Sequence, residues 1–432
     1  MRNLFRKMTP VRIIALGFAL TVLIGAGLLL LPCSVRPGVS LSLIDALYTS
    51  TSAVCVTGLI AVDAYDTFTP FGRCVLGLLI QIGGLGVTAV GAGVIRAIRK
   101  RISIKGRTLL REAMNLDSGK GIVHFLKSVL LTTLTIELAG ACLSFPVFVR
   151  DYSVPQAIGI SLFHSVAAFN NSGFDILGGM RNLTPYRDDV LLNLVTCALI
   201  ILGGIGFLVI REVLEKRFCW KRFSMHTKVV LSVSAVLTFG GMLLLKLTEN
   251  LSWLGALFHS VSARTAGFST YPLSGFTQPG LILMLFLMLV GASPGSTGGG
   301  IKTTTLFVLL TGVRAAATNR SEKAFRYAVP RTAFRKAAVI LLLALEIVFV
   351  STYLLTVLEP SLSLRDALFE MTSAFATVGL STGITGGLGD GAKLLSVVVM
   401  YIGRLGPLTV ATLWHFSRGE RVRFPEGDIA VG

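Results

Sequence analysis

The chain has 432 residues, of which 53% are hydrophobic and only 14% are charged, whereas an average soluble domain carries about 25% charged residues. Its mean hydropathy is +0.76. These values exclude an ordinary soluble domain and indicate an integral membrane protein. The formal net charge of +18 would also suit a nucleic-acid-binding protein, so the placement of the basic residues has to separate the two classes.

The basic residues gather in a few short stretches. Of the 40 Lys and Arg residues, 28 lie before residue 13 and in 96–120, 211–228, 314–336 and 418–423. All these stretches fall on one side of the membrane if the loops between them return to the opposite side, and Lys- and Arg-rich loops stay cytoplasmic. We therefore expect both termini in the cytoplasm and no nucleic-acid partner. The basic loops suit anionic membrane lipids or an acidic cytoplasmic partner.

Eight apolar runs are mostly long enough to cross a hydrocarbon core of about 30 Å, which takes about 20 residues. They cover 13–32, 74–95, 123–149, 188–210, 229–247, 280–292, 337–358 and 394–414. The first run is too long for the apolar part of a signal peptide, and Leu31-Pro32-Cys33 is a weak cleavage site. We expect it to be retained as a helix.

Four short segments between these runs resemble one another, because each leads from an aromatic residue to a glycine nine or ten positions later. They are Tyr48–Gly58, Phe163–Gly173, Phe258–Gly267 and Phe369–Gly379. Each belongs to a short helix of about ten residues that begins after a serine suited to cap it, namely Ser42, Ser153, Ser252 and Ser363. Such helices are too short to cross, so we expect re-entrant pore helices whose C-terminal ends point at the membrane centre.

The sequence thus predicts an all-α membrane protein made of four repeats, each a helix, a pore loop and a second helix. The repeats cover about 10–100, 120–218, 226–318 and 332–418 of a single membrane domain, 1–432. Eight transmembrane helices and four re-entrant pore helices would surround a pore with pseudo-fourfold symmetry. Non-helical backbone at membrane depth is tolerated only where it lines water or is buried in protein.

The ends of the four pore loops suit a cation filter made of backbone carbonyls. Glycine permits the dihedral angles that aim successive carbonyls inward, where they can replace the hydration shell of potassium. The predicted filter residues are Val56, Thr57, Gly58, Asn171, Ser172, Gly173, Thr265, Ala266, Gly267, Thr377, Val378 and Gly379. No loop carries a ring of acidic residues. The alternative is that these glycines only permit close helix packing, but four at equivalent places favour a filter, with potassium as the bound and transported ion.

The second long helix of each repeat also carries glycines. In repeats one and two, Gly83-Gly84-Leu85-Gly86 and Gly203-Gly204-Ile205-Gly206 are interpreted as packing glycines. In repeat three, 291–300 holds five glycines and one proline in ten residues and cannot stay helical. We expect a gate below the filter, the alternative being a static kink. Its predicted residues are Gly291, Ser293, Pro294, Gly295, Ser296, Thr297, Gly298, Gly299, Gly300, Lys302 and Arg404.

Ionisable residues inside a bilayer are functional candidates by default. Arg404 and Lys302 would place positive charge under the filter, and Arg404 has the alternative role of holding carbonyls of the 291–300 loop. Three carboxylates, Glu137, Glu346 and Glu370, are expected to accept hydrogen bonds from N–H groups of the pore loops. His164 and His259 occupy matched positions and are expected to be packing residues. The six cysteines show no metal-binding or disulfide pattern and are expected to be free thiols.

Several of these segments resemble the Trk/Ktr/HKT family of potassium transporters, and in particular the membrane subunit of bacterial Ktr-type uptake systems. The motifs are TSAVCVTGL at 51–59, QIGGLGV at 81–87, FHSVAAFNNSGF at 163–174, GGIGF at 203–207, HTK at 226–228, SARTAGF at 262–268, GSTGGGIKTTT at 295–305, TSAFATVGLSTGIT at 372–385 and GRLGPLT at 403–409. They touch all four repeats. The tail from Phe424 to Gly432 also resembles the C-terminus of these subunits.

The resemblance implies potassium uptake across a bacterial cell membrane, a gating loop at 291–300 and a closing arginine at 404. It implies a homodimer in which each protomer has its own pore, assembled on a cytosolic regulatory ring that binds nucleotides of the ATP/ADP or NAD class. Glycine in all four filters resembles the potassium-selective pattern, since plant relatives with serine at the position of Gly58 tend toward sodium. Sodium coupling remains open, as does the choice of nucleotide.

Two other classes stay in view. A carrier-type transporter with broken helices would more often show inverted repeats, whereas these repeats share one orientation. A membrane enzyme would need a catalytic constellation, which the sequence does not show. We therefore expect no enzymatic activity and no organic cofactor in this chain.

Overall fold

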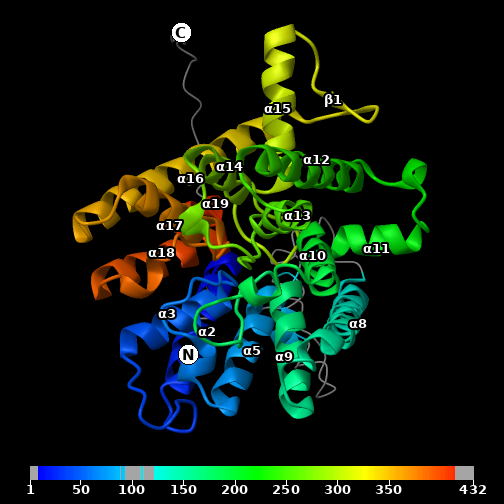
Figure 1. Cartoon of the computed structure of the whole chain (residues 1–432). Coiled ribbons are helices and arrows are strands. Elements are labelled where there is room, and N and C mark those ends of the chain that lie inside the picture. Colours follow the sequence, from blue (N-terminus) through cyan, green and yellow to red (C-terminus); the bar gives the residue numbers. More distant parts are fainter. Residues whose placement is uncertain (1–7, 88, 93–107, 109, 111–120, 414–432) are drawn as a thin grey trace.

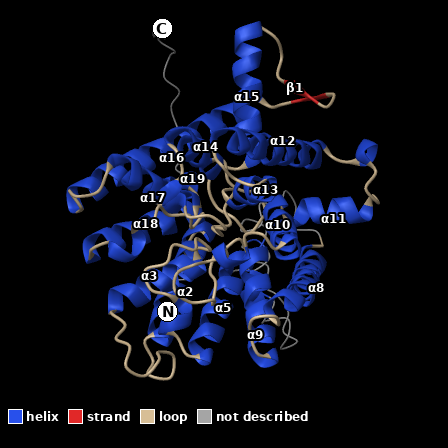
Figure 2. Cartoon of the chain, viewed as in Figure 1, coloured by secondary structure: helices blue, strands red, loops and turns tan. Residues whose placement is uncertain are grey.

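The computed structural model describes residues 8–87, 89–92, 108, 110 and 121–413. Within these ranges the fold is almost entirely helical, apart from a hairpin of β1 (Lys323–Ala324) and β2 (Tyr327–Ala328), which pair antiparallel with Lys323 opposite Ala328 (Figure 2). The predicted all-α class is confirmed. Most of the basic stretch at 96–120, the one at 418–423 and the tail from Phe424 lie outside the described residues.

Each repeat begins with a long apolar helix. These are α2 (Pro10–Leu29), α8 (Ile122–Phe148), α12 (Met225–Thr248) and α16 (Arg331–Leu358). In the described part of the chain, four helices are long and apolar enough to cross a membrane, or five crossings if the bent pair that follows α9 counts as one. Their outward faces carry exposed apolar side chains such as Leu20, Leu134, Phe239 and Phe349, as expected of surfaces that face lipid.

A shorter helix follows in every repeat at the predicted position. The four are α3 (Leu43–Val54), α9 (Val154–Phe169), α13 (Trp253–Ser262) and α17 (Leu364–Ala376). The predicted N-cap serines precede all of them. Ser42, Ser252 and Ser363 accept the backbone N–H of the residue three positions later, whereas Ser153 makes no such bond. Capping by serine is therefore correct for three of the four pore helices.

The second helix of each repeat is shorter than the apolar runs predict. It comprises α5 (Pro70–Leu85), α10 (Val190–Ile205), α14 (Gln278–Leu289) and α18 (Asp390–Leu405). Three of these end at Gly86, Gly206 and Gly406, whose φ angles of 85°, 92° and 89° cannot continue a helix. α11 (Phe207–Glu215) leaves α10 at 98°, α19 (Pro407–Thr412) follows α18 and α15 (Thr303–Thr318) follows α14. The prediction of continuous second helices in repeats one, two and four is wrong.

Short elements join these helices, namely α4 (Ala64–Thr67), η1 (Thr184–Tyr186), η2 (Trp220–Arg222), η3 (Leu273–Gly275) and η4 (Thr385–Gly387). Figure 1 shows the four repeats, coloured from blue to red, following one another around a common centre. Figure 2 shows tan loops running through that centre, surrounded by helices. The pore loops therefore meet inside the protein.

The same packing arrangement joins the three helices within each of three repeats. One glycine of the first helix faces a serine of the pore helix and a leucine of the second helix, so closely that an added methyl group would lie 2.8–2.9 Å from the leucine Cδ1. The serine hydroxyl donates to a carbonyl of the first helix at 2.6–2.7 Å. The three sets are Gly25, Ser50 and Leu79; Gly140, Ser165 and Leu199; and Gly241, Ser260 and Leu287.

Candidate functional site

The four pore-loop glycines form a closed ring. A methyl group added to Gly58 would lie 3.0 Å from the Cα of Gly173, and one added to Gly173 would lie 3.0 Å from the Cα of Gly267. A methyl group added to Gly267 would lie 3.2 Å from the Cα of Gly379, and one added to Gly379 would lie 2.9 Å from the Cα of Gly58. Each glycine also faces the carbonyl oxygen of the residue that precedes the next glycine in the ring. The structure thus brings together all four predicted filter segments.

The backbone follows one pattern in all four segments. Two residues before each glycine, the chain adopts a left-handed conformation with φ between 51° and 72°, at Val56, Asn171, Thr265 and Thr377. The glycines themselves have φ between 67° and 95°. Residues other than glycine rarely adopt such angles, and doing so costs about 1–3 kcal/mol each. Four matched residues with this unusual backbone conformation indicate that the surrounding structure stabilises it, as is typical of functional sites.

The ring presents backbone and small side chains. Eleven of the twelve predicted filter residues are buried, Gly379 is half-buried, and none of the twelve is charged. The four pore helices end three to five residues before the glycines, so the partial negative charge of their C-terminal ends converges on the ring. Carbonyl oxygens and helix C-termini favour a cation, so the arrangement can replace part of an ion's hydration shell.

Serines of the pore helices anchor the ring, which the sequence patterns did not single out. Ser52 Oγ accepts the N–H of Gly58 at 3.0 Å, and Ser373 Oγ accepts the N–H of Gly379 at 3.0 Å. In repeat three, Ser262 donates instead to the carbonyl of Phe268. The only sequence signal for this role is the matching position of the three serines within the repeats.

A second feature that the sequence did not reveal is the segment 177–183, which we call the outer strap. It lies on the side of the ring where the predicted extracellular loops lie. Asn182 Nδ2 donates to the carbonyl of Gly173 at 3.2 Å, and Asn182 Oδ1 accepts the N–H of Ser269 at 3.0 Å. Asp63 and Asp66 of repeat one accept the N–H groups of Met180 and Gly179. The outer strap therefore ties the second filter segment to repeats one and three.

One buried carboxyl group lies beside the outer strap. Asp175 follows Gly173 by two residues, and its Oδ1 accepts the N–H of Leu177 at 3.0 Å. An ionised carboxylate at this place would add negative potential at the outer end of the ring, which favours cations.

The loop between α14 and α15 lies against the inner end of the ring. A methyl group added to Gly298 would lie 3.0 Å from Cβ of Thr265, and one added to Gly299 would lie 3.1 Å from Cβ of Thr377. The loop starts and ends side by side, since Val290 and Ile301 form a parallel bridge. The predicted loss of helix over 291–300 is confirmed, and we call this segment the inner loop.

Neighbouring repeats hold the inner loop. The N–H of Ser293 donates to the carbonyl of Gly204 at 2.9 Å, and the N–H of Phe207 donates to the carbonyl of Gly295 at 3.1 Å. Both partners lie at the break between α10 and α11. The interpretation of Gly203 as a packing glycine is correct, because an added methyl group would lie 3.0 Å from the carbonyl carbon of Phe169. Gly206 has the additional role of breaking the helix.

Two cations contact the inner loop. Lys302 Nζ donates to the carbonyls of Gly298 at 2.7 Å and Gly299 at 3.2 Å. Arg404 donates to the carbonyl of Thr297 and, from the other side, to the carbonyls of Gly83 and Gly84. The prediction that Arg404 holds carbonyls of this loop is confirmed. Arg404 also joins the loop to the break at the end of α5.

The predicted carboxylate roles are corrected in part. Glu137 accepts Asn170 Nδ2 at 2.9 Å and Gln81 Nε2 at 3.2 Å, so it does bind an N–H group of a pore loop. Glu370 instead accepts the hydroxyls of Ser381 and Thr385 at 2.7 and 2.6 Å. Glu346 lies exposed on α16 and is not an acceptor for a pore loop. Helical periodicity turns its side chain away from the ring.

The remaining polar candidates are packing residues. His164 Nε2 lies 2.9 Å from Thr196 Oγ1, and its ring packs edge-on against Phe148 and Phe268. His259 accepts the N–H of Tyr271 at 3.2 Å. The prediction that both histidines pack is confirmed. All six cysteines are free thiols, as expected.

Comparison with known proteins identifies the family of this chain. The sequence matches the family TrkH, described as cation transport protein, over residues 23–232 and 223–418. It is similar to Ktr system potassium uptake protein B of Bacillus subtilis, with 38% identity over 99% of this chain and 97% of that protein. It is also similar to potassium/sodium uptake protein NtpJ of Enterococcus hirae, with 36% identity over 99% and 98% of the two chains.

The fold is similar to that of the potassium transporter TrkH from Vibrio parahaemolyticus, with a TM-score of 0.74 at 19% sequence identity, over 94% of this chain and 85% of that one. The family resemblance drawn from the sequence motifs is confirmed. With its apolar helices and its full-length relatives, the chain is a multi-pass membrane protein that belongs to the TrkH family of cation transport proteins.

Proposed function

We propose that this chain is the membrane subunit of a potassium uptake system and that potassium passes through the ring of four pore loops. The observation that carries the proposal is the cyclic contact of Gly58, Gly173, Gly267 and Gly379 together with the four left-handed residues before them. A ring of buried backbone without charged side chains suits a monovalent cation that sheds its water. The names of the relatives, which include potassium uptake proteins, support potassium as the ion.

We infer that the inner loop is the gate. It lies directly against Thr265 and Thr377 at the inner end of the ring, so an ion leaving the filter meets it next. Lys302 and Arg404 bind three carbonyls of this loop. A hydrogen bond from a charged group contributes about 1.5–3 kcal/mol, so releasing the loop costs several kcal/mol. That is comparable to the roughly 5.5 kcal/mol needed to move a two-state equilibrium from 1:99 to 99:1.

A partner that pulls on α15 could supply this free energy. α15 begins at Thr303, next to Lys302, and continues to the hairpin of β1 and β2. We therefore propose that a cytosolic regulatory ring with nucleotide-binding domains of the ATP/ADP or NAD class acts on this end of the protein. Relatives named as Ktr system proteins support a partner subunit. Both termini would be cytoplasmic and the membrane would be the bacterial inner membrane.

We propose further that the protein is a homodimer. Glu346 is exposed near the middle of α16, between Leu342 and Phe349, whose side chains are 66% and 77% exposed. An ionisable side chain facing lipid is costly. A second protomer over this face would shield it. The name of one relative, a potassium/sodium uptake protein, supports sodium as a second candidate ion.

The proposal is tested by potassium uptake in a bacterial strain that lacks its own uptake systems. The chain, expressed with its regulatory partner, should restore growth at low potassium. Potassium flux into proteoliposomes containing the purified chain then separates a pore from a membrane enzyme. The proposal would be overturned if the protein is present in the membrane but neither restores growth at low potassium nor gives potassium flux into proteoliposomes.

A further inference from the structure

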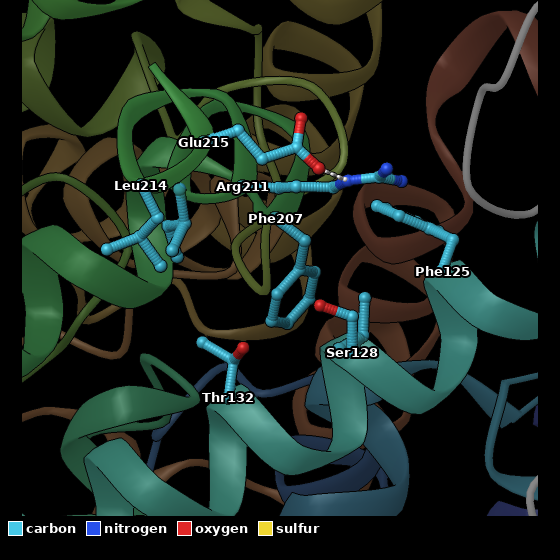
Figure 3. Close-up of a pocket in the computed structure, with 9 residues that line it drawn as sticks. Phe125, Ser128, Thr132, Phe207, Arg211, Leu214 and Glu215 are labelled. Atoms are coloured by element: carbon cyan, nitrogen blue, oxygen red, sulfur yellow. Dashed lines mark hydrogen bonds and ion pairs between the residues drawn. The ribbon is translucent and has the colours of Figure 1, made fainter. Parts of the chain in front are cut away.

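A cavity of about 140 Å³ lies between α8 and α11, away from the ring (Figure 3). Its lining combines aromatic rings with polar groups, and the residues that matter here are Phe125, Ser128 and Thr132 on α8 and Phe207, Arg211 and Glu215 on α11. Figure 3 shows the hydroxyls of α8 on one side of the cavity and Arg211 with Glu215 on the other. Neither the pore nor the inner loop uses these polar groups directly.

The polar groups have free hydrogen-bonding capacity. Ser128 and Thr132 are four residues apart and so share one face of α8, and neither hydroxyl has a partner among the residues that the structure describes. Arg211 Nε donates to Glu215 Oε1 at 2.6 Å, and its guanidinium lies 5.8 Å from the centre of the Phe125 ring. Among the described residues, none forms a hydrogen bond with the two terminal nitrogens of Arg211. A guanidinium with two hydroxyls is the chemistry that recognises a phosphate group.

The position of the cavity favours a lipid over a soluble anion. α8 has 27 residues, which at 1.5 Å per residue span about 40 Å, more than the roughly 30 Å of the hydrocarbon core. Its first turns, which carry Phe125 and Ser128, therefore lie at the level of the headgroups. Basic residues continue from Arg211 through 228, which marks the cytoplasmic surface, where anionic lipids are found. Apolar side chains of the lining can receive the start of an acyl chain.

The cavity is connected to the inner loop. Phe207, which lines it, donates its backbone N–H to the carbonyl of Gly295 at 3.1 Å. A smaller cavity of about 40 Å³ shares Phe125 and Phe207 with the first and reaches Gly295 and Ser296. A ligand in the larger cavity would therefore restrict Phe207, and through it the inner loop.

We propose that this cavity binds an anionic phospholipid of the cytoplasmic leaflet and that the bound lipid holds the inner loop in its closed position. The lipid phosphate would replace Glu215 as the partner of the Arg211 guanidinium. A ligand favours the conformation that contains its site, and here the cavity exists with the inner loop held against the ring. The proposed effect of the lipid on the inner loop rests on the proposed role of that loop as the gate. The proposed binding of the lipid to the cavity does not depend on that role.

Binding is tested by native mass spectrometry of the purified protein with phosphatidylglycerol or phosphatidylcholine. The wild type should retain phosphatidylglycerol, and Arg211→Gln should lose it by about fivefold or more. Glu215→Gln, which frees Arg211, should retain it better than the wild type. The control Lys221→Gln removes an exposed basic residue of η2 outside the cavity and should behave as the wild type.

The double variant Ser128→Ala with Thr132→Ala gives a second test that leaves Arg211 and its ion pair intact, and it should also weaken retention of phosphatidylglycerol. Equal retention by the wild type, Arg211→Gln and the double variant would overturn the proposal. Displacement of the lipid by inorganic phosphate at equal concentration would also overturn it, because a free anion would then be the better ligand.

Coupling is tested by potassium flux without the partner, in vesicles with and without phosphatidylglycerol. Wild-type flux should be about fivefold lower when phosphatidylglycerol is present, and Arg211→Gln should abolish this difference while Lys221→Gln keeps it. Intact binding with no effect of the lipid on flux would overturn the coupling. The proposed gate is judged separately by Arg404→Ala, whose effect does not need the lipid.

Discussion

The close contacts of Gly58 within the ring make Gly58→Ser an informative perturbation. Gly58 has φ of 90°, and an added Cβ would lie 3.0 Å from both the Cα of Gly173 and the carbonyl carbon of Ser172. The carbonyl oxygen of Ser172 lies closer still, and ordinary van der Waals contact begins at 3.4 Å, so the Ser172 carbonyl has to retreat by more than about 0.4 Å. A side chain at this backbone angle also costs about 1–3 kcal/mol.

The shifted carbonyl belongs to the ring that is proposed to replace the hydration shell of potassium. We expect the discrimination of potassium over sodium to fall about tenfold, equivalent to about 1.4 kcal/mol, while the protein still reaches the membrane. The assay measures initial uptake of both ions in a strain without its own potassium uptake systems, with the amount of protein in the membrane determined by immunoblot.

Two further variants make this result specific. Gly379→Ser should act in the same way, because its Cβ would lie 2.9 Å from the Cα of Gly58, in the neighbouring contact of the ring. Gly275→Ser is the matched control, since nothing lies within 4 Å of its added Cβ and it should keep wild-type discrimination. If Gly58→Ser also keeps it at wild-type amounts, the ring does not select the ion and the reasoning is refuted.

Three other predictions concern the gate, the outer strap and the topology. Arg404→Ala, or a deletion within 294–299, should raise potassium flux into proteoliposomes and loosen its dependence on the partner, because Arg404 no longer holds Thr297; wild-type flux with full partner dependence would indicate a static kink. Asn182→Asp keeps the acceptor for Ser269 but loses the donor to Gly173, which is worth about 1 kcal/mol, so we expect the potassium-to-sodium uptake ratio to fall about fivefold; an unchanged ratio would limit Asn182 to a structural role. Cysteines introduced at 101–118 and 319–330 should react with an impermeant reagent only from the cytoplasm, and those at 60–70 only from outside. Labelling of both sets from one face would contradict the re-entrant loops.

Much of the architecture follows from local sequence features. Apolar length predicts the four unbroken helices, since a hydrocarbon core fixes how many residues must be apolar. The serine before each pore helix predicts its start, because a hydroxyl can accept a free N–H group at a helix end. The recurring glycines predict where the four loops end, and the composition of 291–300 excludes a helix there by backbone entropy and the missing N–H of Pro294.

The breaks at Gly86, Gly206 and Gly406 could not be read from the sequence in the same way. A glycine in an apolar run either packs closely within a helix or ends it. Within one motif, Gly203 packs closely and Gly206 ends the helix. Only the surrounding contacts decide, since the carbonyl of Phe169 crowds Gly203, whereas φ of 92° at Gly206 lets α11 turn toward α8.

The sequence by itself determined the membrane class, the four repeats and the residue types of the ring. Tertiary structure decided which distant groups meet. Asn182 reaches Gly173 and Ser269, Arg404 reaches Thr297 and Gly83, and Glu346 turns outward. These outcomes depend on how the repeats are rotated around the centre, which is fixed by side chains packed between helices far apart in the chain, and no local pattern encodes that rotation.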